Sequence, residues 1–472
     1  MPTETVSAGG EFDLVSKVLP YLDRLLIFAL LEHMSEVKLY PESALLELKY
    51  AVMKDTDMVT YLAETYSALH QADADSAATK AELAQIAARK DSVLATLRTF
   101  EETTRSTLEI LREPELAQHM KTEKAQNIAY MKSTHGFTDA QIVDLYNYGQ
   151  AQYNCGKYAE AAELLGLFRG LSLDSELVSS ATWGKFACSV MTVQWDAAVE
   201  ELAKVREILD TRSSVDPLVL LNQRTWLIHW SLFFFFNGPA GRAAVAELFL
   251  APAYVNTIQT SCPWVLRYLT VAILTNTSLR TASSSKSARA SQLSYQQYQK
   301  QVKELVRVIR QEQYEYRDPI TEFVYALYVD FDFEEAQNKL VELEAVVRHD
   351  PFLVGCADEF LESARYVIAE LYCQIHQRID IKDLSARLNL SHEEGEKWIV
   401  NLIRDTRVDA KINFAEGTVI MNHPPVSVYQ QVIERTKGLS FRTSQMLAHV
   451  LSARSSAAAA GRDDDEAEHD EE

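Results

Sequence analysis

The stretch from Ile375 to Met421 constrains the fold more strongly than any other part of this chain, because signals for helices and then for strands follow one another in it. Apolar side chains first recur at helical spacing, at Ile381, Leu384, Leu388 and Leu390. Ser391 then opens a second helix, and Glu394 three residues later completes the pattern of a capping box. These signals predict a helix, a tight turn and a second helix.

The pattern changes after Arg407 from helical spacing to the alternation that is typical of strands. The alternate apolar residues are Val408, Ala410 and Ile412. Glu416-Gly417 supplies turn chemistry, and Val419 to Met421 reads as a returning strand. A hairpin that follows two helices is the layout of a winged helix, which we place at residues 375–422.

A winged helix often binds DNA through its second helix, whose basic and amide side chains meet phosphates and base edges. The polar face of that helix here carries Lys397, Asn401, Arg404 and Arg407. Its apolar face consists of Trp398, Ile399, Leu402 and Ile403. The composition opposes DNA binding, because 67 acidic residues outnumber 46 basic ones and give a formal charge of -21. We therefore expect a winged helix that packs against proteins, with a local RNA contact through the polar face and Lys411 as the alternative.

The rest of the chain favours helices, since it has only 15 glycines and 12 prolines in 472 residues. The five cysteines are scattered and never form a C-x-x-C pair, so we expect reduced core thiols in an intracellular protein. The amino terminus, residues 1–11, lacks a secretory signal and reads as flexible. The apolar run from Trp226 to Phe236 is too short to span a bilayer, and we expect it to be a buried helix.

A repeated device between residues 12 and 374 predicts stacked helix pairs. An aromatic residue is followed three positions later by alanine at Tyr158 and Ala161, at Trp195 and Ala198, and at Phe333 and Ala336. Alanine lets paired helices approach closely, as in tetratricopeptide-like repeats. We predict a right-handed helical-repeat solenoid, with N-terminal repeats at 12–215 and further helices at 216–374. Separate helices are expected at 79–100 and 101–111, and a mobile serine-rich loop at 281–294 precedes a helix that starts near Tyr295.

The segment after the winged helix predicts a helix with no core of its own. Pro424-Pro425 breaks the chain, and residues 423–452 then read as a terminal amphipathic helix. Its apolar side includes Val432, Ile433 and Leu447, which we take as candidate contacts with a partner. Residues 453–472 combine alanines with dense negative charge, and we expect a disordered acidic tail.

No catalytic, cofactor or metal-binding pattern stands out in the sequence. There is no H-E-x-x-H, no H-x-H pair and no G-x-S-x-G, and Gly156-Lys157 lacks the spacing of a phosphate-binding loop, so it reads as a turn between helices. His229 has no second histidine or carboxylate at helical spacing, so we expect a hydrogen-bonded core histidine. The sequence predicts a protein that is not an enzyme and has no small-molecule substrate.

A solenoid that ends in a winged helix resembles the PCI family, the shared building block of the proteasome lid, the cullin-deneddylating signalosome and translation initiation factor 3. Four long strings are similar to an initiation factor subunit of that family. They are RTWLIHWSLFFFFN at 224–237, NTIQTSCPWVLRYLT at 256–270, YRDPITEFVYALYVDFDFEEAQ at 316–337 and EKWIVNLIRDTRVDAKI at 396–412. The serine-rich insertion and the acidic tail depart from the family pattern and inherit no role from it.

The resemblance implies a scaffold subunit whose winged helix joins an arc of other winged helices and whose last helix enters a shared bundle. It implies subunits c, l and d of the factor as neighbours, together with the small ribosomal subunit, 43S preinitiation complex formation and mRNA recruitment in the cytoplasm; a nuclear pool stays open. Candidate contacts with a neighbouring subunit are Asn401, Arg404, Arg407, Lys411 and Asn413. The alternatives are a scaffold of the proteasome lid or signalosome, or a winged-helix RNA- or DNA-binding protein of an mRNA-export complex.

Overall fold

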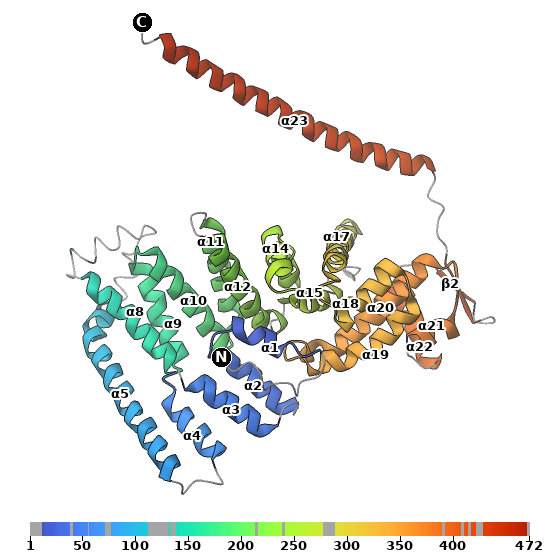
Figure 1. Cartoon of the computed structure of the whole chain (residues 1–472). Coiled ribbons are helices and arrows are strands. Elements are labelled where there is room, and N and C mark those ends of the chain that lie inside the picture. The colour runs from blue at the N-terminus through green and yellow to red at the C-terminus, as the bar shows by residue number, and fades with distance from the viewer. Residues whose placement is uncertain are drawn as a thin grey trace.

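The computed structural model gives a mostly helical chain that ends in a small antiparallel sheet and one long helix (Figure 1). The structure describes residues 12–37, 41–54, 56–70, 77–111, 131, 133, 138–212, 216–237, 241–276, 288–388, 392–406, 410–413, 417–421 and 428–469. The predicted fold class, helical repeats followed by a winged helix, is confirmed.

The first half of the chain consists of helices that stack on their neighbours in sequence order. They are α1 (Val15–Val18), η1 (Leu19–Tyr21), α2 (Ile27–Val37), α3 (Glu42–Met53), α4 (Val59–Leu69), α5 (Ala77–Leu111), α8 (Asp139–Asn154), α9 (Tyr158–Leu171), α10 (Ser175–Met191) and α11 (Trp195–Thr211). One prediction is wrong here, because α5 is a single helix and not two that meet at Glu101. The sequence around Glu101 contains no proline or glycine, so nothing interrupts the helix.

The second half continues the stack into the winged helix. Its helices are α12 (Pro217–Asn237), α13 (Gly241–Phe249), α14 (Pro252–Ser261), α15 (Val265–Leu274), α17 (Ala288–Glu312), α18 (Pro319–Tyr325), the π-helical turn η4 (Ala326–Asp330), α19 (Phe333–His349), η5 (Val354–Cys356) and α20 (Ala357–Ile375). Helix α17 begins at Ala288, earlier than the predicted start near Tyr295. The predicted loop is therefore helical from 288 onward, and residues 281–287 lie outside the described part of the chain.

The predicted aromatic and alanine marks sit where helix pairs meet. The three aromatic residues are the first residues of α9, α11 and α19. The three alanines, Ala161, Ala198 and Ala336, are fully buried, which confirms that small side chains permit close helix packing at these points. Gly156, with φ of 83°, forms the turn between α8 and α9. This confirms the prediction that Gly156-Lys157 is a turn between helices and not a phosphate-binding loop.

Helix α12 forms the centre of the main core. Its residues Leu227, Ile228, Leu232, Phe234 and Phe235 are each at most 1% exposed, which confirms a buried helix. No helix among the described residues is long and apolar enough to cross a membrane. All five cysteines are unpaired, and four of them are buried.

His229 in α12 is the hydrogen-bonded core histidine that the sequence predicted. The indole Nε1–H of Trp264 donates to Nε2 of His229 at 3.1 Å, so the proton of the neutral ring is on Nδ1, which donates to the carbonyl of Thr225 at 2.7 Å. Burial lowers the pKa of His229 to about 4, since a charged ring would lose its hydration.

The winged helix is built from β1 (Arg378–Asp380), α21 (Ile381–Arg387), α22 (His392–Thr406), β2 (Ala410–Asn413) and β3 (Thr418–Met421). Strand β3 lies between β1 and β2, antiparallel to both. Strand β1 was not predicted, because three residues are too short for an alternating pattern to be recognised. The predicted capping residue, Ser391, lies outside the described residues.

Gly395 and Gly417 hold this module together in different ways. A Cβ on Gly395 would lie 2.0 Å from the hydroxyl oxygen of Ser385, so only glycine allows α22 to lie this close to α21. Gly417 has φ of 61° at the turn into β3, consistent with the predicted turn.

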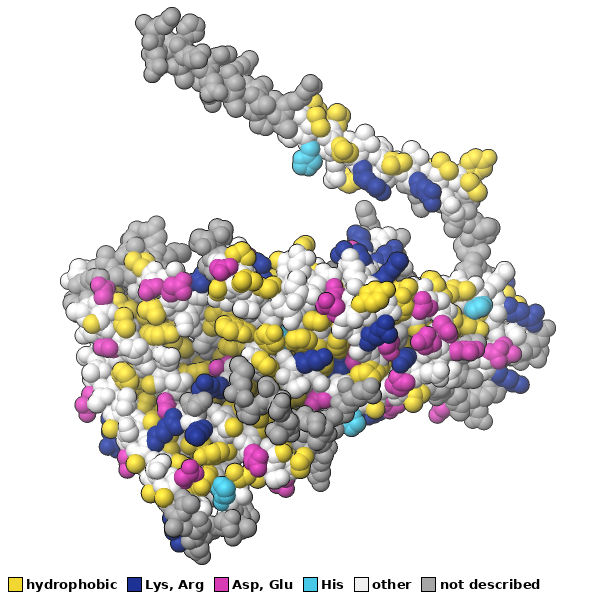
Figure 2. All heavy atoms as spheres, in the orientation of Figure 1, with side chains coloured by type: hydrophobic (Ala, Val, Ile, Leu, Met, Phe, Trp, Pro, Cys, Tyr) yellow, Lys and Arg dark blue, Asp and Glu magenta, His cyan; other side chains and the backbone are white. Residues whose placement is uncertain are grey.

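Helix α23 (Val428–His469) lies apart from the stack in Figure 1. It continues to His469, beyond the predicted end at residue 452. Residues 453–469 are therefore helical where we expected a disordered tail. Four consecutive alanines at 457–460 have the highest helix propensity of any residue and favour the continuation as far as residue 460. Figure 2 shows hydrophobic side chains exposed along the part of α23 whose side chains are described.

The N-terminal segment, which we define as residues 12–34, packs against helices of the main core that are distant from it in sequence. Tyr21 stacks on His229 with ring centres 4.7 Å apart, and Trp230 donates from its indole nitrogen to the carbonyl of Tyr21 at 3.0 Å. The carbonyl of Phe12 accepts a hydrogen bond from Arg267 at 2.7 Å across 255 positions of sequence. The start of the chain therefore stabilises helices α12 and α15.

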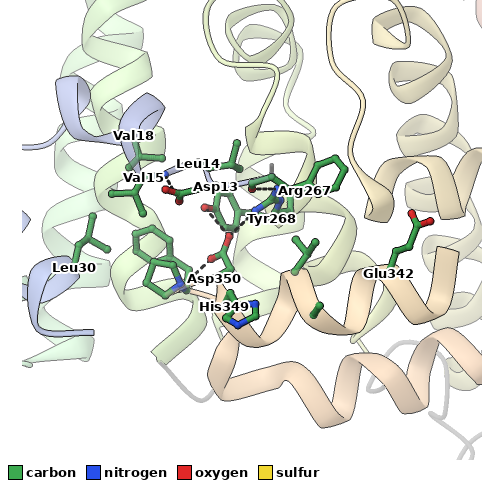
Figure 3. A pocket seen from close by; sticks show the side chains of 15 residues that line it. Asp13, Leu14, Val15, Val18, Leu30, Arg267, Tyr268, Glu342, His349 and Asp350 are labelled. Atoms are coloured by element: carbon green, nitrogen blue, oxygen red, sulfur yellow. Dashed lines mark hydrogen bonds and ion pairs between the residues drawn. The ribbon is translucent and has the colours of Figure 1, made fainter. Parts of the chain in front are cut away.

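A buried ion cluster joins this segment to α15, α18 and α19, and Figure 3 shows its members Arg267 and Asp350. Arg267 donates from Nε to Asp318 at 3.2 Å and from Nη1 to Asp350 at 3.0 Å, and all three side chains are at most 2% exposed. Burial alone would lower the pKa of Arg267, but the two carboxylates raise it. Burial raises the pKa of Asp350, and Arg267 opposes that rise. The cluster lies beside a cavity of about 360 Å³ whose other walls include apolar side chains of the N-terminal segment.

A second buried carboxylate, Glu201, ties together three helices of the stack. Its side chain is 3% exposed and contacts Arg169 of α9, Lys185 of α10 at 3.3 Å and Lys204 of its own helix at 2.9 Å. Burial alone would raise the pKa of Glu201, but hydrogen bonds from Arg169 and Lys204 and the charges of Arg169 and Lys185 lower it to about 2.

Replacing Glu201 by glutamine should lower the free energy of unfolding by about 2 kcal/mol at pH 7, because three cations lose their shared carboxylate. The folded-state pKa lies below the usual value of 4.5, so the stabilisation is present above pH 4.5 and is lost as pH falls toward 2. Urea unfolding at pH 7 and pH 4 should therefore give a smaller difference at pH 4. Glu160→Gln, which removes an exposed pair with Lys157, is the control and should cost under about 1 kcal/mol. A Glu201 deficit that does not change with pH would contradict the assignment.

Candidate partner-binding surfaces

The winged helix presents one polar face on its sheet. Lys411 is exposed and Asn413 partly exposed on β2, and they point to the same side because alternate residues of a strand share a face. Lys411 lies opposite Ile420 of β3, and Ile420 lies opposite Arg378 of β1. We call these four residues the wing face. It places an apolar side chain, 38% exposed, between two basic ones.

Arg378 and Ile420 were missed as candidates at the sequence level. Arg378 belongs to the strand that was not predicted, and the exposure of Ile420 depends on the register of β3 against both neighbours. Of the remaining candidates, Asn401 is exposed on α22. Arg404 lies in α22 but its side chain is not among those described, and Arg407 lies outside the described residues. The structure therefore brings together Lys411 and Asn413 of the predicted set.

The opposite side of the winged helix is fixed to the solenoid. Ile399 is 3% exposed, and Trp398 packs edge-to-face on Tyr366 of α20 with ring centres 6.3 Å apart. Both residues were assigned to the module core from sequence, whereas the side chain of Leu402 is not among those described. A winged helix held in this way presents the wing face in a fixed direction from the stack.

Helix α23 forms the second candidate surface. The predicted contact residues Val432, Ile433 and Leu447 are 56%, 52% and 59% exposed. Further large apolar side chains exposed on the same side of this helix are Val428, Tyr429, Leu439, Met446, Val450 and Leu451, whereas Phe441 is exposed on the other side. An isolated surface residue of this kind is ordinary, but a contiguous set on one helix marks an interaction site.

The described residues contain no group of side chains arranged to hold a metal ion. The large pKa shifts include those of Arg267 and His229, which are buried in the core and paired with protein groups. The surfaces that remain accessible, the wing face and α23, offer contact area and hydrogen bonds to another macromolecule.

Three stretches of the chain match described protein families. Residues 13–152 match the eIF3 subunit 6 N terminal domain, residues 338–423 match the PCI domain, and residues 427–448 match the C-terminal region of the E subunit of eukaryotic translation initiation factor 3. The PCI match covers the winged helix, α20 and the part of α19 from residue 338 onward. The third match covers most of the exposed apolar part of α23, so that helix is a feature the family shares.

Curated relatives extend the similarity to nearly the whole chain. A protein of Aspergillus clavatus, named as the E subunit of eukaryotic translation initiation factor 3, is 50% identical over 442 residues, which are 94% of each chain. A protein of the same name from Yarrowia lipolytica is 49% identical over 93% of this chain and 98% of its own. With identity at this level over this length, this chain belongs to the E-subunit family of eukaryotic translation initiation factor 3.

Proposed function

We propose that this chain is a non-enzymatic scaffold subunit of initiation factor 3 that holds other subunits through the wing face and α23. The observation that carries the proposal is the apolar side of α23, where Val432, Ile433 and Leu447 are each more than half exposed. Removing such side chains from water stabilises by about 1.5–3 kcal/mol each, so a helix of this kind gains stability when a partner covers it.

Two threonine hydroxyls on that side of α23 do not oppose burial. The hydroxyl of Thr436 donates to the carbonyl of Val432 at 2.7 Å, and the hydroxyl of Thr443 donates to that of Leu439 at 2.9 Å. A hydroxyl already bonded within its own helix needs no partner from outside. The helix can therefore enter an apolar interface without leaving these groups unsatisfied.

The wing face supplies a second, more polar contact. Lys411 and Asn413 lie on β2, which pairs only with β3 among the described strands and so has its other edge available. An exposed edge and basic side chains suit contact with an acidic neighbouring subunit. The neighbours we propose are subunits c, l and d, and the assembled factor would act on the small ribosomal subunit in the cytoplasm, in 43S complex formation and mRNA recruitment.

The test replaces Val432, Ile433 and Leu447 by aspartate in the full-length tagged chain and measures which subunits copurify, by quantitative mass spectrometry. We expect the other subunits to fall at least tenfold, because three carboxylates enter an apolar contact. The matched control replaces Phe441, Gln445 and Ser452, which lie on the other side of α23, by aspartate and should retain the complex. Full association of the first variant would contradict the proposal, as would copurification of proteasome-lid or signalosome subunits in place of those of the factor.

A further inference from the structure

The exposed side of α23 repeats every seven residues. Tyr429, Thr436, Thr443 and Val450 form one row, Val432, Leu439 and Met446 a second, and Ile433, Ser440 and Leu447 a third. A seven-residue repeat matches helices that wind around one another, because 3.5 residues per turn keep the same face toward a partner. The repeat gives α23 a continuous apolar stripe that a second helix can follow along its length.

A basic row runs directly beside this apolar side. Arg435, Arg442 and His449 are also seven residues apart, and all three are exposed. At about 100° per residue, they follow one edge of the apolar side, next to the row of Leu439 and Met446. Figure 2 shows basic and histidine side chains along one edge of α23, beside the hydrophobic ones.

The basic row stands out against the charge of the whole chain. Residues 428–452 contain three lysines or arginines and one glutamate, whereas the chain as a whole has a formal charge of -21. In paired helices, side chains at the edge of the apolar seam meet those of the partner, and their charges determine which helices pair. A basic partner edge would be repelled at this position, and an acidic one would be attracted.

We infer that α23 pairs with an amphipathic helix of another subunit that presents carboxylates along the edge facing Arg435 and Arg442. This inference rests on the proposed function and specifies the chemistry of the partner. The remaining lysine, Lys437, lies on the far edge of the apolar side, about 140–160° around the helix from the basic row. It carries the same charge but faces away from the acidic edge, so it is a built-in control.

The first arm of the experiment reverses charge in the full-length chain. Arg435→Glu combined with Arg442→Glu should lower copurification of the partner subunit about tenfold or more, because attraction becomes repulsion on the paired edge. Lys437→Glu should lower it less than about threefold. Equal losses for the two variants, or full retention of the doubly reversed chain, would overturn the inference.

The second arm detects the carboxylates directly. In the complex that contains Arg435→Lys and Arg442→Lys, a carbodiimide should join the new lysine amines to carboxylates of one helix of another subunit, while Lys437 gives no link to that helix. Failure to form these links overturns the inference, as does loss of the wild-type interaction on ribonuclease treatment, which would place RNA against the row. The chain with Arg435→Glu and Arg442→Glu could bind normally while the aspartate changes at Val432, Ile433 and Leu447 still release the partner. That result would contradict the inference of an acidic partner helix and leave the proposed scaffold function in place.

Discussion

Replacing Arg267 by alanine should lower the free energy of unfolding by about 3–5 kcal/mol at pH 7. The guanidinium is the shared partner of Asp318 and Asp350, and all three side chains are at most 2% exposed. Its removal leaves two carboxylates in the core and also releases the carbonyl of Phe12, which Arg267 holds at 2.7 Å. The first loss acts on the packing of α15 against the ends of α18 and α19, and the second on the contact of the N-terminal segment with α15.

The loss should depend on pH in a defined direction. Burial already raises the pKa of Asp350, and without Arg267 nothing comparable opposes that rise. A carboxyl whose folded-state pKa is raised destabilises the folded state when it is ionised, and this cost decreases as pH falls and the group takes up a proton. The deficit of Arg267→Ala should therefore be largest near pH 7.5 and smaller at pH 5.

Urea unfolding of both proteins at pH 7.5, 6 and 5 would measure this trend. The contribution of Glu201 does not interfere, because it begins to be lost only below about pH 4.5. Arg307→Ala, which breaks an exposed pair with Glu304, is the matched control and should cost under about 1 kcal/mol at every pH. A deficit for Arg267→Ala within that range, or one that grows toward pH 5, would show that the cluster does not stabilise the fold in this way.

The cluster also marks a limit of prediction from sequence. Arg267 lies 51 residues from Asp318 and 83 from Asp350, and no local pattern relates residues so far apart. The same holds for Tyr21 and His229, whose stacking joins distant segments. Local patterns succeeded where the determining interaction is local, as in the buried run of α12 and the alanines between paired helices.

The two candidate surfaces also differ in how far local sequence patterns could predict them. The exposed side of α23 was predictable because the periodicity of a single helix defines it and no other described element covers it. The wing face was predicted only in part, since Ile420 and Arg378 join it through strand register. The register of β1 against β3 depends on hydrogen bonds between segments that are about 40 residues apart in sequence, and a single short strand carries too little pattern to indicate it.

Ending the chain at Pro425 should release it from the purified factor while its own fold remains intact. The described side chains of α23 from Val428 to Leu451 are exposed apart from Gly438, so the truncation uncovers no core residue. We expect the thermal midpoint of the isolated truncated chain to lie within about 2 °C of the full-length value, because the buried area is unchanged. We expect its copurification with other subunits to fall more than tenfold, because every apolar contact of the helix is lost.

A shorter truncation separates the apolar side of α23 from the acidic tail. Removing residues 454–472 leaves Val432, Ile433, Leu447 and the basic row in place, so association with the factor should be kept. If this shorter truncation alone releases the chain, the tail and not the apolar side is the main contact. If the chain that ends at Pro425 stays bound, the wing face and the solenoid are sufficient for assembly, and α23 contributes little to the binding free energy. Retention after the shorter truncation together with release after the longer one is the result that assigns the contact to residues 428–451.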